Sequence, residues 1–359
     1  MAWSPQFVDN LCWRLKALGA PKVLVFATLL TIWTDIPESS WQDNSVFSFV
    51  ETFAGEAQAT MAFRSSDFRS ARLDLKYMSA EADRCNPMDL CTPPGFATAL
   101  AIILRGDVDK GWWNHYGLKC ASWTAVNSGT SGRSPCSSIG NIEHASVREA
   151  NCLGSRMLLL MMVAVCLNAV ITLEQPFSSF FEFYPRFRDF IRMLQHTGGP
   201  HAVHKTSWYM LHYGGPTPKR HYAFANTHHI DKLNLGQLRG WLQKKEALKE
   251  LGQTYDLVDK YVDASGQPRW KGNKRLRSSE CYPQKFGQKL VEMFYLMIKE
   301  KRGMPELPEH VPSAAETFAS MSFDDMWQEA FMSDVCHYLR GGVYLKVPPS
   351  FSGLLPKRL

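Results

Sequence analysis

The sequence lacks the features that mark several whole classes of protein. Its nine cysteines are odd in number, irregularly spaced and free of Cys-x-x-Cys pairs, which argues against a disulfide framework. It has no internal repeat and no complete Gly-x-Gly-x-x-Gly motif. With 45% hydrophobic and 21% charged residues it has neither a disordered nor a collagen-like composition. We therefore expect a folded protein in a reducing, intracellular environment.

Long hydrophobic runs are also scarce. The apolar segment Val23–Trp33 is shorter than the roughly 20 residues that cross a bilayer. The longer segment Met157–Leu173 is interrupted by Asn168 and changes from Leu and Met to β-branched residues. That change predicts a buried helix followed by a buried strand. We predict no membrane partner, and a membrane anchor remains the alternative because the length is borderline.

Positive charge is concentrated in one part of the chain. The whole sequence has 40 basic and 34 acidic residues, a net charge of +6, and the stretch from Lys219 to Arg302 holds 18 basic and 9 acidic ones. Such a local excess is typical of a surface that meets nucleic acid or another polyanion. The alternative is the solvated face of ordinary helices.

The order of apolar segments predicts an α/β fold. Predicted strands lie at Val46–Glu51, Ala71–Leu75, Leu118–Trp123, Val170–Glu174, Thr206–Tyr213 and Tyr222–Ala225, and helical segments at Phe7–Leu18, Ala57–Arg64, Pro93–Leu104, Glu149–Leu167, Gly236–Leu251, Gln284–Lys301 and Phe318–Cys336. This alternation indicates a mostly parallel, Rossmann-like sheet with helices on both faces. The last two strands are joined by a Gly/Pro turn, which predicts an antiparallel hairpin at the edge.

Changes in composition suggest four regions. Residues 1–45 form an N-terminal helical extension, and residues 46–226 form the α/β domain. Residues 227–302 form a small, basic, helical region that is suited to recognition. Residues 303–359 begin with a proline-rich linker and continue into a C-terminal helix and tail.

A glycine turn after the first predicted strand introduces the candidate site. Phe53, Ala54 and Gly55 form this turn, and Asp74 follows about twenty residues later at the end of the second strand. At that interval an acidic side chain is able to bind ribose hydroxyls. Asp89 precedes the next helix. The pair of a turn and a carboxylate predicts a nucleotide-type ligand, and an ordinary turn residue at Asp74 is the alternative.

The order of these and later segments resembles the DNA cytosine-C5 branch of the class I S-adenosylmethionine-dependent methyltransferases. In that family a Phe-Ala-Gly turn wraps the methionine part of the cofactor, and Glu51–Gln58 looks like it. The resemblance implies that Asp74 holds the ribose, that Asp89 holds the adenine, and that S-adenosyl-L-methionine is the cofactor. The part of the chain that resembles the family is about residues 46 to 287.

The same resemblance implies a set of catalytic residues. Leu118–Thr124 occupies the place of the family's Pro-Pro-Cys-Gln segment, which makes Cys120 the nucleophile that activates cytosine through a covalent bond at C6. Glu174 would hold the edge of the base and assist its protonation. Lys219 and Arg220 would hold the phosphate or the base.

The sequence also departs from the family pattern. Leu118 and Lys119 replace the two prolines, Gln175 replaces the asparagine after the glutamate, and no clear closing Gly-Asn motif follows. Two alternatives therefore stay open. One is a catalytically degenerate relative that binds nucleic acid or a protein partner. The other is a methyltransferase of RNA, protein or a small molecule that forms no bond to Cys120, whose thiol would then be structural.

Several basic residues are predicted to contact nucleic acid, with DNA as the expected partner. They are Arg133 in a polar loop and Lys271, Lys274, Arg275 and Arg277 in the basic run. The run would also serve as a nuclear-import signal. Six of the eleven histidines lie between residues 201 and 229, but none has the spacing of a zinc finger, so we predict no metal site.

Overall fold

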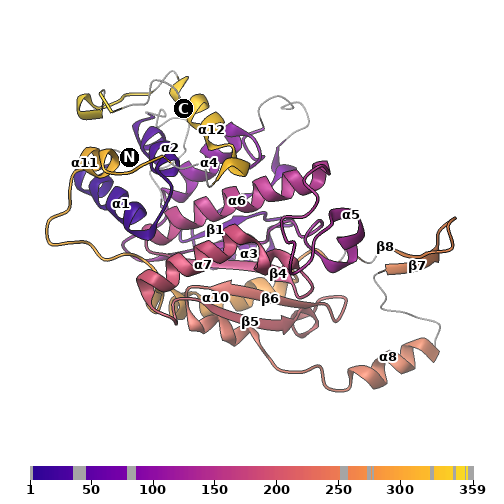
Figure 1. The fold of residues 1–359 in the computed structure, drawn as a ribbon. Helices are drawn as coiled ribbons and strands as arrows, with labels where there is room; N and C mark the ends of the chain where they lie inside the picture. The colour runs from indigo at the N-terminus through magenta and orange to yellow at the C-terminus, as the bar shows by residue number, and fades with distance from the viewer. Residues whose placement is uncertain are drawn as a thin grey trace.

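A six-stranded sheet forms the centre of the protein (Figure 1). The computed structural model describes residues 3–34, 46–78, 86–250, 258–272, 276, 279–323, 327–342, 345–351 and 353–354. The sheet has the order β2-β1-β3-β4-β6-β5. Its strands are β1 (Phe49–Thr52), β2 (Ser70–Leu73), β3 (Trp112–Tyr116), β4 (Ala169–Pro176), β5 (His204–Tyr209) and β6 (Arg220–Ala225).

Strand direction confirms the predicted fold class. Strands β1 to β4 pair in parallel, and β6 pairs antiparallel with both β4 and β5. The protein is therefore an α/β protein with a mostly parallel sheet and an antiparallel edge hairpin. The chain passes from β1 to β2 on one side and then to β3 on the other side of β1. This reversal makes the carboxyl ends of β1 and β3 the switch point, where open α/β sheets bind ligands.

Helices cover both faces of the sheet. On one face lie α1 (Pro5–Leu18), α2 (Lys22–Trp33), α4 (Pro93–Ile103), α6 (Ala145–Cys166), α7 (Pro185–Gly198), α11 (Ala314–Ala319) and α12 (Met332–Arg340). On the other lie α3 (Gln58–Ser65) and α10 (Gln284–Lys299). Neighbouring strand residues divide between the two cores, since Val50 packs in the first and Phe49 in the second.

Helix α6 is the one helix among the described residues that is long and apolar enough to cross a membrane by length and composition. Its most apolar window is 94% buried inside the protein. The predicted change from helix to strand is confirmed, because β4 follows directly. Here α6 serves as the central helix of the larger core.

Two predicted elements are wrong. The strand predicted at Leu118–Trp123 is a turn, in which Trp123 N and Thr124 N both donate to Cys120 O, and the strand is β3. All five residues of β3 are buried, so it shows no alternation. The single helix predicted at Phe318–Cys336 is instead interrupted. Helix α11 ends at Ala319, and the short 3-10 turn Gln328–Ala330 is separated from α12 by Phe331, whose φ is 49°.

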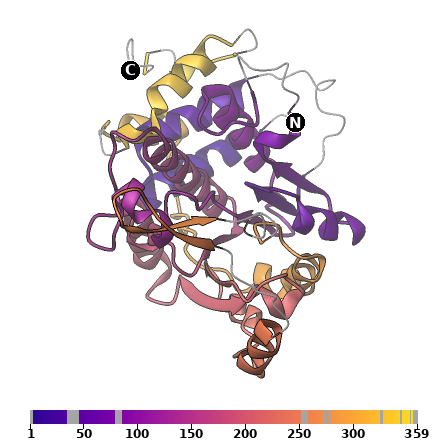
Figure 2. The ribbon, with the colours of Figure 1, turned by 90° about the vertical axis from the view of Figure 1, so that its right-hand side faces the viewer.

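The ends of the chain and the basic region occupy different places. Helices α1 and α2 pack with α11 and α12, and the turned view shows the N- and C-terminal helices together at the top (Figure 2). Within the predicted region 227–302, α10 belongs to the second core. By contrast, α8 (Trp241–Glu250) and the hairpin of β7 (Val258–Val262) and β8 (Pro268–Gly272) extend away from the body (Figure 1).

Candidate functional site

A cavity of about 270 Å³ opens at the switch point. We call it the switch-point cavity. Three of the predicted cofactor residues line it, namely Phe53 after β1, Asp74 after β2 and Asp89 before α4. Gly117, after β3, forms another part of the wall. Most of the remaining wall is apolar and comes from strand ends, α4 and α6. The cavity thus combines two carboxylates with apolar surfaces, as a site for a nucleoside-type ligand would.

The glycine turn and Asp74 hold each other in place. Gly55 N donates to Asp74 Oδ2 over 2.9 Å, and Tyr77 OH donates to Gly55 O over 2.6 Å. The backbone is left-handed at Phe53, Gly55 and Ala57, with φ of 62°, 52° and 52°. Such conformations are costly outside glycine and mark a tightly wound turn. Ala54 is buried, and neither Ala54 nor Gly55 is among the residues that line the cavity.

Asp89 is positioned by the start of α4. Its Oδ1 accepts from Cys91 N over 2.9 Å, and its carbonyl accepts from Thr92 N. A Cβ on Gly95 would lie only 1.8 Å from Asp89 O, so only glycine fits there. Thr92 caps the helix by accepting from Gly95 N. The second carboxylate of the cavity therefore lies on a rigid loop.

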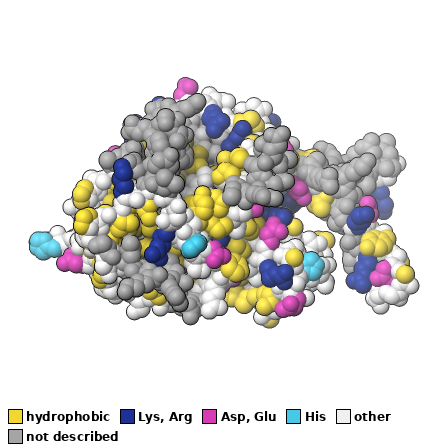
Figure 3. All heavy atoms as spheres, turned by 90° about the horizontal axis from the view of Figure 1, so that it is seen from above, with side chains coloured by type: hydrophobic (Ala, Val, Ile, Leu, Met, Phe, Trp, Pro, Cys, Tyr) yellow, Lys and Arg dark blue, Asp and Glu magenta, His cyan; other side chains and the backbone are white. Residues whose placement is uncertain are grey.

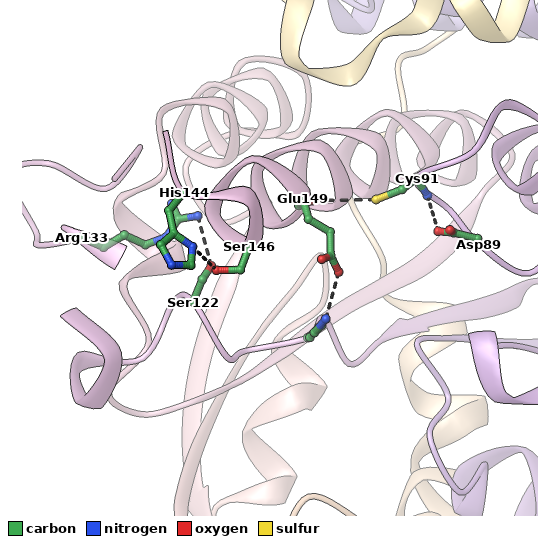
Figure 4. Close-up of polar contacts among 8 residues, drawn as sticks. Asp89, Cys91, Ser122, Arg133, His144, Ser146 and Glu149 are labelled. Atoms are coloured by element: carbon green, nitrogen blue, oxygen red, sulfur yellow. Dashed lines mark hydrogen bonds and ion pairs between the residues drawn. The ribbon is translucent and has the colours of Figure 1, made fainter. Parts of the chain in front are cut away.

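An ion pair forms the rim of the cavity. Lys119 Nζ lies 2.9 Å from Glu149 Oε1 on α6, and both side chains are largely exposed. Figure 4 shows the Glu149 carboxylate pointing down from α6, with Asp89 and Cys91 on one side and Ser146 on the other. Lys119 and Glu149 also line a smaller polar recess of about 150 Å³. The pair therefore separates two neighbouring hollows.

Cys120 lies in the turn that follows β3 and is half-buried. Gln175 holds this turn, since its Nε2 donates to Leu118 O over 2.6 Å and its Oε1 accepts from Ser179 Oγ. Burial raises the pKa of the Cys120 thiol, Lys219 lowers it, and Glu174 raises it further. The net direction is upward, so the resting group is a thiol and not the thiolate that a nucleophile requires.

Glu174 lies at the centre of a buried polar network. His221 Nδ1 donates to its Oε1, and Tyr282 OH donates to its Oε2 over 2.8 Å. Burial raises the pKa of Glu174, but His221, Lys219 and Tyr282 outweigh it and leave the pKa below its ordinary value. Glu174 is therefore a carboxylate. His221 is 4% exposed, and its Nε2 has no partner among the described residues.

The network continues to β3. His115 Nε2 lies 3.2 Å from Tyr282 OH, and His115 Nδ1 lies 2.7 Å from Thr172 Oγ1. Burial lowers the pKa of His115 to about 4, so its ring is neutral. Since Tyr282 OH donates to Glu174, His115 Nε2 donates to Tyr282. We call Glu174, His221, Tyr282, His115 and Thr172 the Glu174 cluster.

Of the five members of this cluster the sequence analysis predicted only Glu174, and it missed His221, Tyr282, His115 and Thr172. Tyr282 lies 108 residues beyond Glu174, in the loop before α10, and no local pattern marks it. Its hydroxyl lies close to Gly117, which is part of the cavity wall, because a Cβ on Gly117 would lie 2.9 Å from it and 3.4 Å from Phe53 O. The two parts of the candidate site therefore meet at Gly117.

The two predicted basic catalytic residues are separated. Lys219 is close enough to act on the charges of both Cys120 and Glu174. Arg220 is exposed, donates to Ser207 Oγ over 2.7 Å and lies over the Phe177 ring. Side chains alternate along a strand, so Arg220 and His221 lie on opposite faces of β6. Of the two, only Lys219 joins the candidate site.

Arg133, which the sequence predicts to contact nucleic acid, is buried and bonded to other residues of the protein. It is 2% exposed, its guanidinium stacks 3.4 Å from the centre of the Trp123 ring, and it donates to Ser122 Oγ over 3.2 Å (Figure 4). It also donates to Asn151 Oδ1 over 2.9 Å. These bonds fold the polar loop onto α6 and leave no surface for a phosphate.

The predicted basic run is described only in part. Lys271 is exposed in β8, whereas Lys274, Arg275 and Arg277 lie outside the described residues. In the view from above, Lys and Arg side chains are scattered among apolar ones and form no single patch on that face (Figure 3). A docking surface for nucleic acid remains a prediction.

The fold and the site together define an α/β protein with a six-stranded, mostly parallel sheet that opens into a ligand-sized cavity at its switch point. The chain matches no protein-family model, no curated protein and no solved structure.

Proposed function

We propose that the chain is a methyltransferase-like protein that binds S-adenosyl-L-methionine and acts on nucleic acid, at cytosine C5 of DNA, through Cys120. One observation carries the proposal. Phe53, Asp74 and Asp89, which the resemblance to the cytosine-C5 methyltransferases assigns to the cofactor, line a single cavity at the switch point. They come from three separate segments of the chain, after β1, after β2 and before α4.

The residues present suit this cofactor. The Asp74 carboxylate would accept hydrogen bonds from ribose hydroxyls, and the apolar wall that includes Met88 and Leu90 would cover the adenine beside Asp89. The turn at Gly55 would face the methionine part. The cofactor would supply an electrophilic methyl group. The chain would then supply binding, orientation and the nucleophile.

Base chemistry would fall to Cys120, Lys219 and Glu174. The Cys120 thiol would pass its proton to a water molecule. Its sulfur would then form a bond to C6 of the cytosine while the C5–C6 π bond breaks and leaves its electron pair on C5. After C5 has taken the methyl group, a base would remove the C5 proton, and the C–S bond would break to return the thiolate. Lys219 favours the thiolate, and the Glu174 carboxylate would hold the edge of the base.

A trapping experiment tests this proposal. DNA containing 5-fluorocytosine would stop the reaction at the covalent stage, because the fluorine at C5 cannot leave as a cation. We expect a denaturation-resistant complex with the wild type in the presence of cofactor, its loss in Cys120→Ser, and its retention in the control Cys136→Ser, which changes an exposed thiol. Cofactor binding without any complex would contradict the base chemistry.

A second candidate is a protein that keeps ligand and nucleic-acid binding but lacks base chemistry. Two observations favour it, namely the raised pKa of the Cys120 thiol and the separation of Arg220 from the site. This candidate predicts unchanged DNA affinity in Cys120→Ser and no methyl transfer by the wild type. Methylation of RNA, protein or a small molecule that persists in Cys120→Ser would instead support the remaining alternative.

A further inference from the structure

Two adjacent histidines and a glutamate converge at the opposite end of the sheet from the switch point. His228 and His229 begin the 3-10 turn His228–Leu233 after β6, and Glu300 is the C-cap of α10. Their ligand atoms, one from each residue, all lie within 4.8 Å of one another. We propose that this trio binds a divalent transition metal of the Zn²⁺ type. The proposal is independent of the proposed function.

The distances fit shared ligation better than direct hydrogen bonds. Glu300 Oε2 lies 3.4 Å from His228 Nδ1 and 3.5 Å from His229 Nε2. An N–H···O bond is usually 2.7–3.2 Å long, so both contacts are too long for good bonds. Ligand bonds of about 2.0–2.1 Å at a tetrahedral angle would place neighbouring donor atoms about 3.3–3.4 Å apart. The two distances from Glu300 therefore match those of shared ligation, and the third donor pair, His228 with His229, lies within 4.8 Å.

The chemistry of the ligands indicates the kind of ion. Two imidazole nitrogens and one carboxylate oxygen form a set that Zn²⁺ binds with water in the fourth position. The carboxylate stands at the C-terminal end of α10, where the helix dipole also favours positive charge. Among the described residues, the Glu300 carboxylate forms ion pairs only with these two imidazoles. It is therefore not committed to a lysine or an arginine.

Rigid backbone holds both sides of the trio. Thr227 Oγ1 accepts from His229 N and so fixes the start of the turn. On the other side, Arg302 N donates to Asn226 O over 2.9 Å, and Asn226 Nδ2 donates to Arg302 O over 3.1 Å. Lys301, which lines the neighbouring cavity, donates its ammonium to Ile298 O. These bonds fix the backbone on both sides of the trio, which lowers the entropic cost of bringing the three ligands together.

Two members of the trio, His228 and Glu300, line a cavity of about 330 Å³. His201 and His204 also line it, and the His204 and His228 rings lie 5.9 Å apart. His204 Nε2 lies 2.9 Å from His201 O, so this nitrogen already has a partner and the proposed site does not include His204 as a ligand. An ion at the trio would remain accessible to water and to a chelator. It would link the turn after β6 to the end of α10.

Titration of the full chain with Zn²⁺ and Co²⁺ tests the site. We expect one equivalent to bind, with visible absorption bands of four- or five-coordinate Co²⁺. His228→Ala, His229→Ala and Glu300→Gln should each weaken binding by more than about tenfold. The control His310→Ala, which changes an exposed histidine elsewhere, should bind like the wild type. Wild-type binding no tighter than that of Glu300→Gln would overturn the proposal.

Two further measurements keep the result interpretable. A Cys136→Ser/Cys281→Ser variant removes the exposed thiols of the described residues and should keep the site. Binding that disappears in this variant would assign the ion to the cysteines and overturn the proposal. Zn²⁺ should also raise the Tm of the wild type and not that of Glu300→Gln, since a ligand stabilises only the state that binds it. Equal shifts would contradict the site as well.

Discussion

The switch-point cavity and the Glu174 cluster lie at the same edge of the sheet but are built in different ways. Phe53, Asp74 and Asp89 each follow or precede a regular element and line the open cavity, where backbone N–H groups hold the two carboxylates. The Glu174 cluster is buried, and its members bond to one another across β3, β4, β6 and the loop before α10, with only His221 Nε2 left without a partner among the described residues. The switch-point cavity is open space lined by two carboxylates, whereas the Glu174 cluster is a buried network that stabilises one carboxylate.

Removing the central carboxylate should produce the largest effect. In Glu174→Ala, His221 and Tyr282 lose their common partner in a buried setting, so we expect a loss of about 3–5 kcal/mol in the free energy of unfolding. Urea denaturation would measure it. At the cavity rim, the Lys119–Glu149 pair is exposed, so Glu149→Ala should cost about 0–1 kcal/mol. Equal losses in the two variants would remove the distinction between the regions.

Glu51 in β1, close to both regions in the sheet, should make the stability of the protein depend on pH. Burial raises the pKa of Glu51 to about 7, with Thr60 opposing the shift, and its Oε1 has no partner among the described residues. The folded protein then holds a proton that the unfolded chain releases near pH 4.5, so stability should fall as pH rises from about 4.5 to 7.

The slope of this decline should approach about 1.4 kcal/mol per pH unit. Glu51→Gln cannot release the proton, and urea denaturation across this range should therefore show a flatter profile for the variant. Parallel profiles for wild type and variant would contradict the raised pKa. A variant that is more stable than the wild type at pH 8 would sharpen the case for a buried, protonated Glu51.

Gly117 is the point at which the two regions touch. A methyl group there would meet Tyr282 OH at 2.9 Å, so Gly117→Ala should destabilise the protein by about 1–3 kcal/mol. In the Tyr282→Phe background the hydroxyl is gone, and the same substitution should cost less, with a coupling of about 0.5–3 kcal/mol. A double-mutant cycle by urea denaturation would measure the coupling. Additive losses would show that the regions do not meet at this residue.

The smallest expected effect concerns the reactivity of Cys120. Lys219 lowers the pKa of this thiol, so Lys219→Met should raise that pKa and slow alkylation at pH 8 by about two- to fivefold. Peptide mass spectrometry would separate Cys120 from the exposed Cys136 and Cys281. Lys205→Met, which changes a lysine paired with Glu182, should leave the rate unchanged. Equal rates in all three proteins would place Lys219 outside the site.

The same contrast explains what the sequence predicted. The glycine turn, Asp74 and Asp89 are local features, because strand ends and turns leave a pattern in a few consecutive residues. Their joint presence in one cavity follows from the parallel sheet, which the alternation of elements predicted correctly. For these residues the order of segments along the chain was enough to predict that they lie at the same edge of the sheet.

The remaining features depend on contacts that no local pattern records. The sequence places this strand at Leu118–Trp123, later in the chain than β3, because Asn114 and His115 are polar and do not resemble core residues. In the structure they are buried because Val50 O and Thr172 satisfy their side chains. Arg133 lies in a polar stretch of sequence that predicts a surface residue, but its bonds to Ser122 and Asn151 hold it inside the protein. Tyr282 and Glu300 lie far along the chain from the residues they meet.

The central claim is that the switch-point cavity binds S-adenosyl-L-methionine through Asp74. Calorimetric titration of the cofactor into the wild type, Asp74→Ala and the control Asp109→Ala, which changes an exposed aspartate, tests it most directly. We predict one binding site in the wild type and the control, and affinity lowered by at least about tenfold in Asp74→Ala. A wild type that does not bind, or an Asp74→Ala variant that binds as tightly as the wild type, would contradict it.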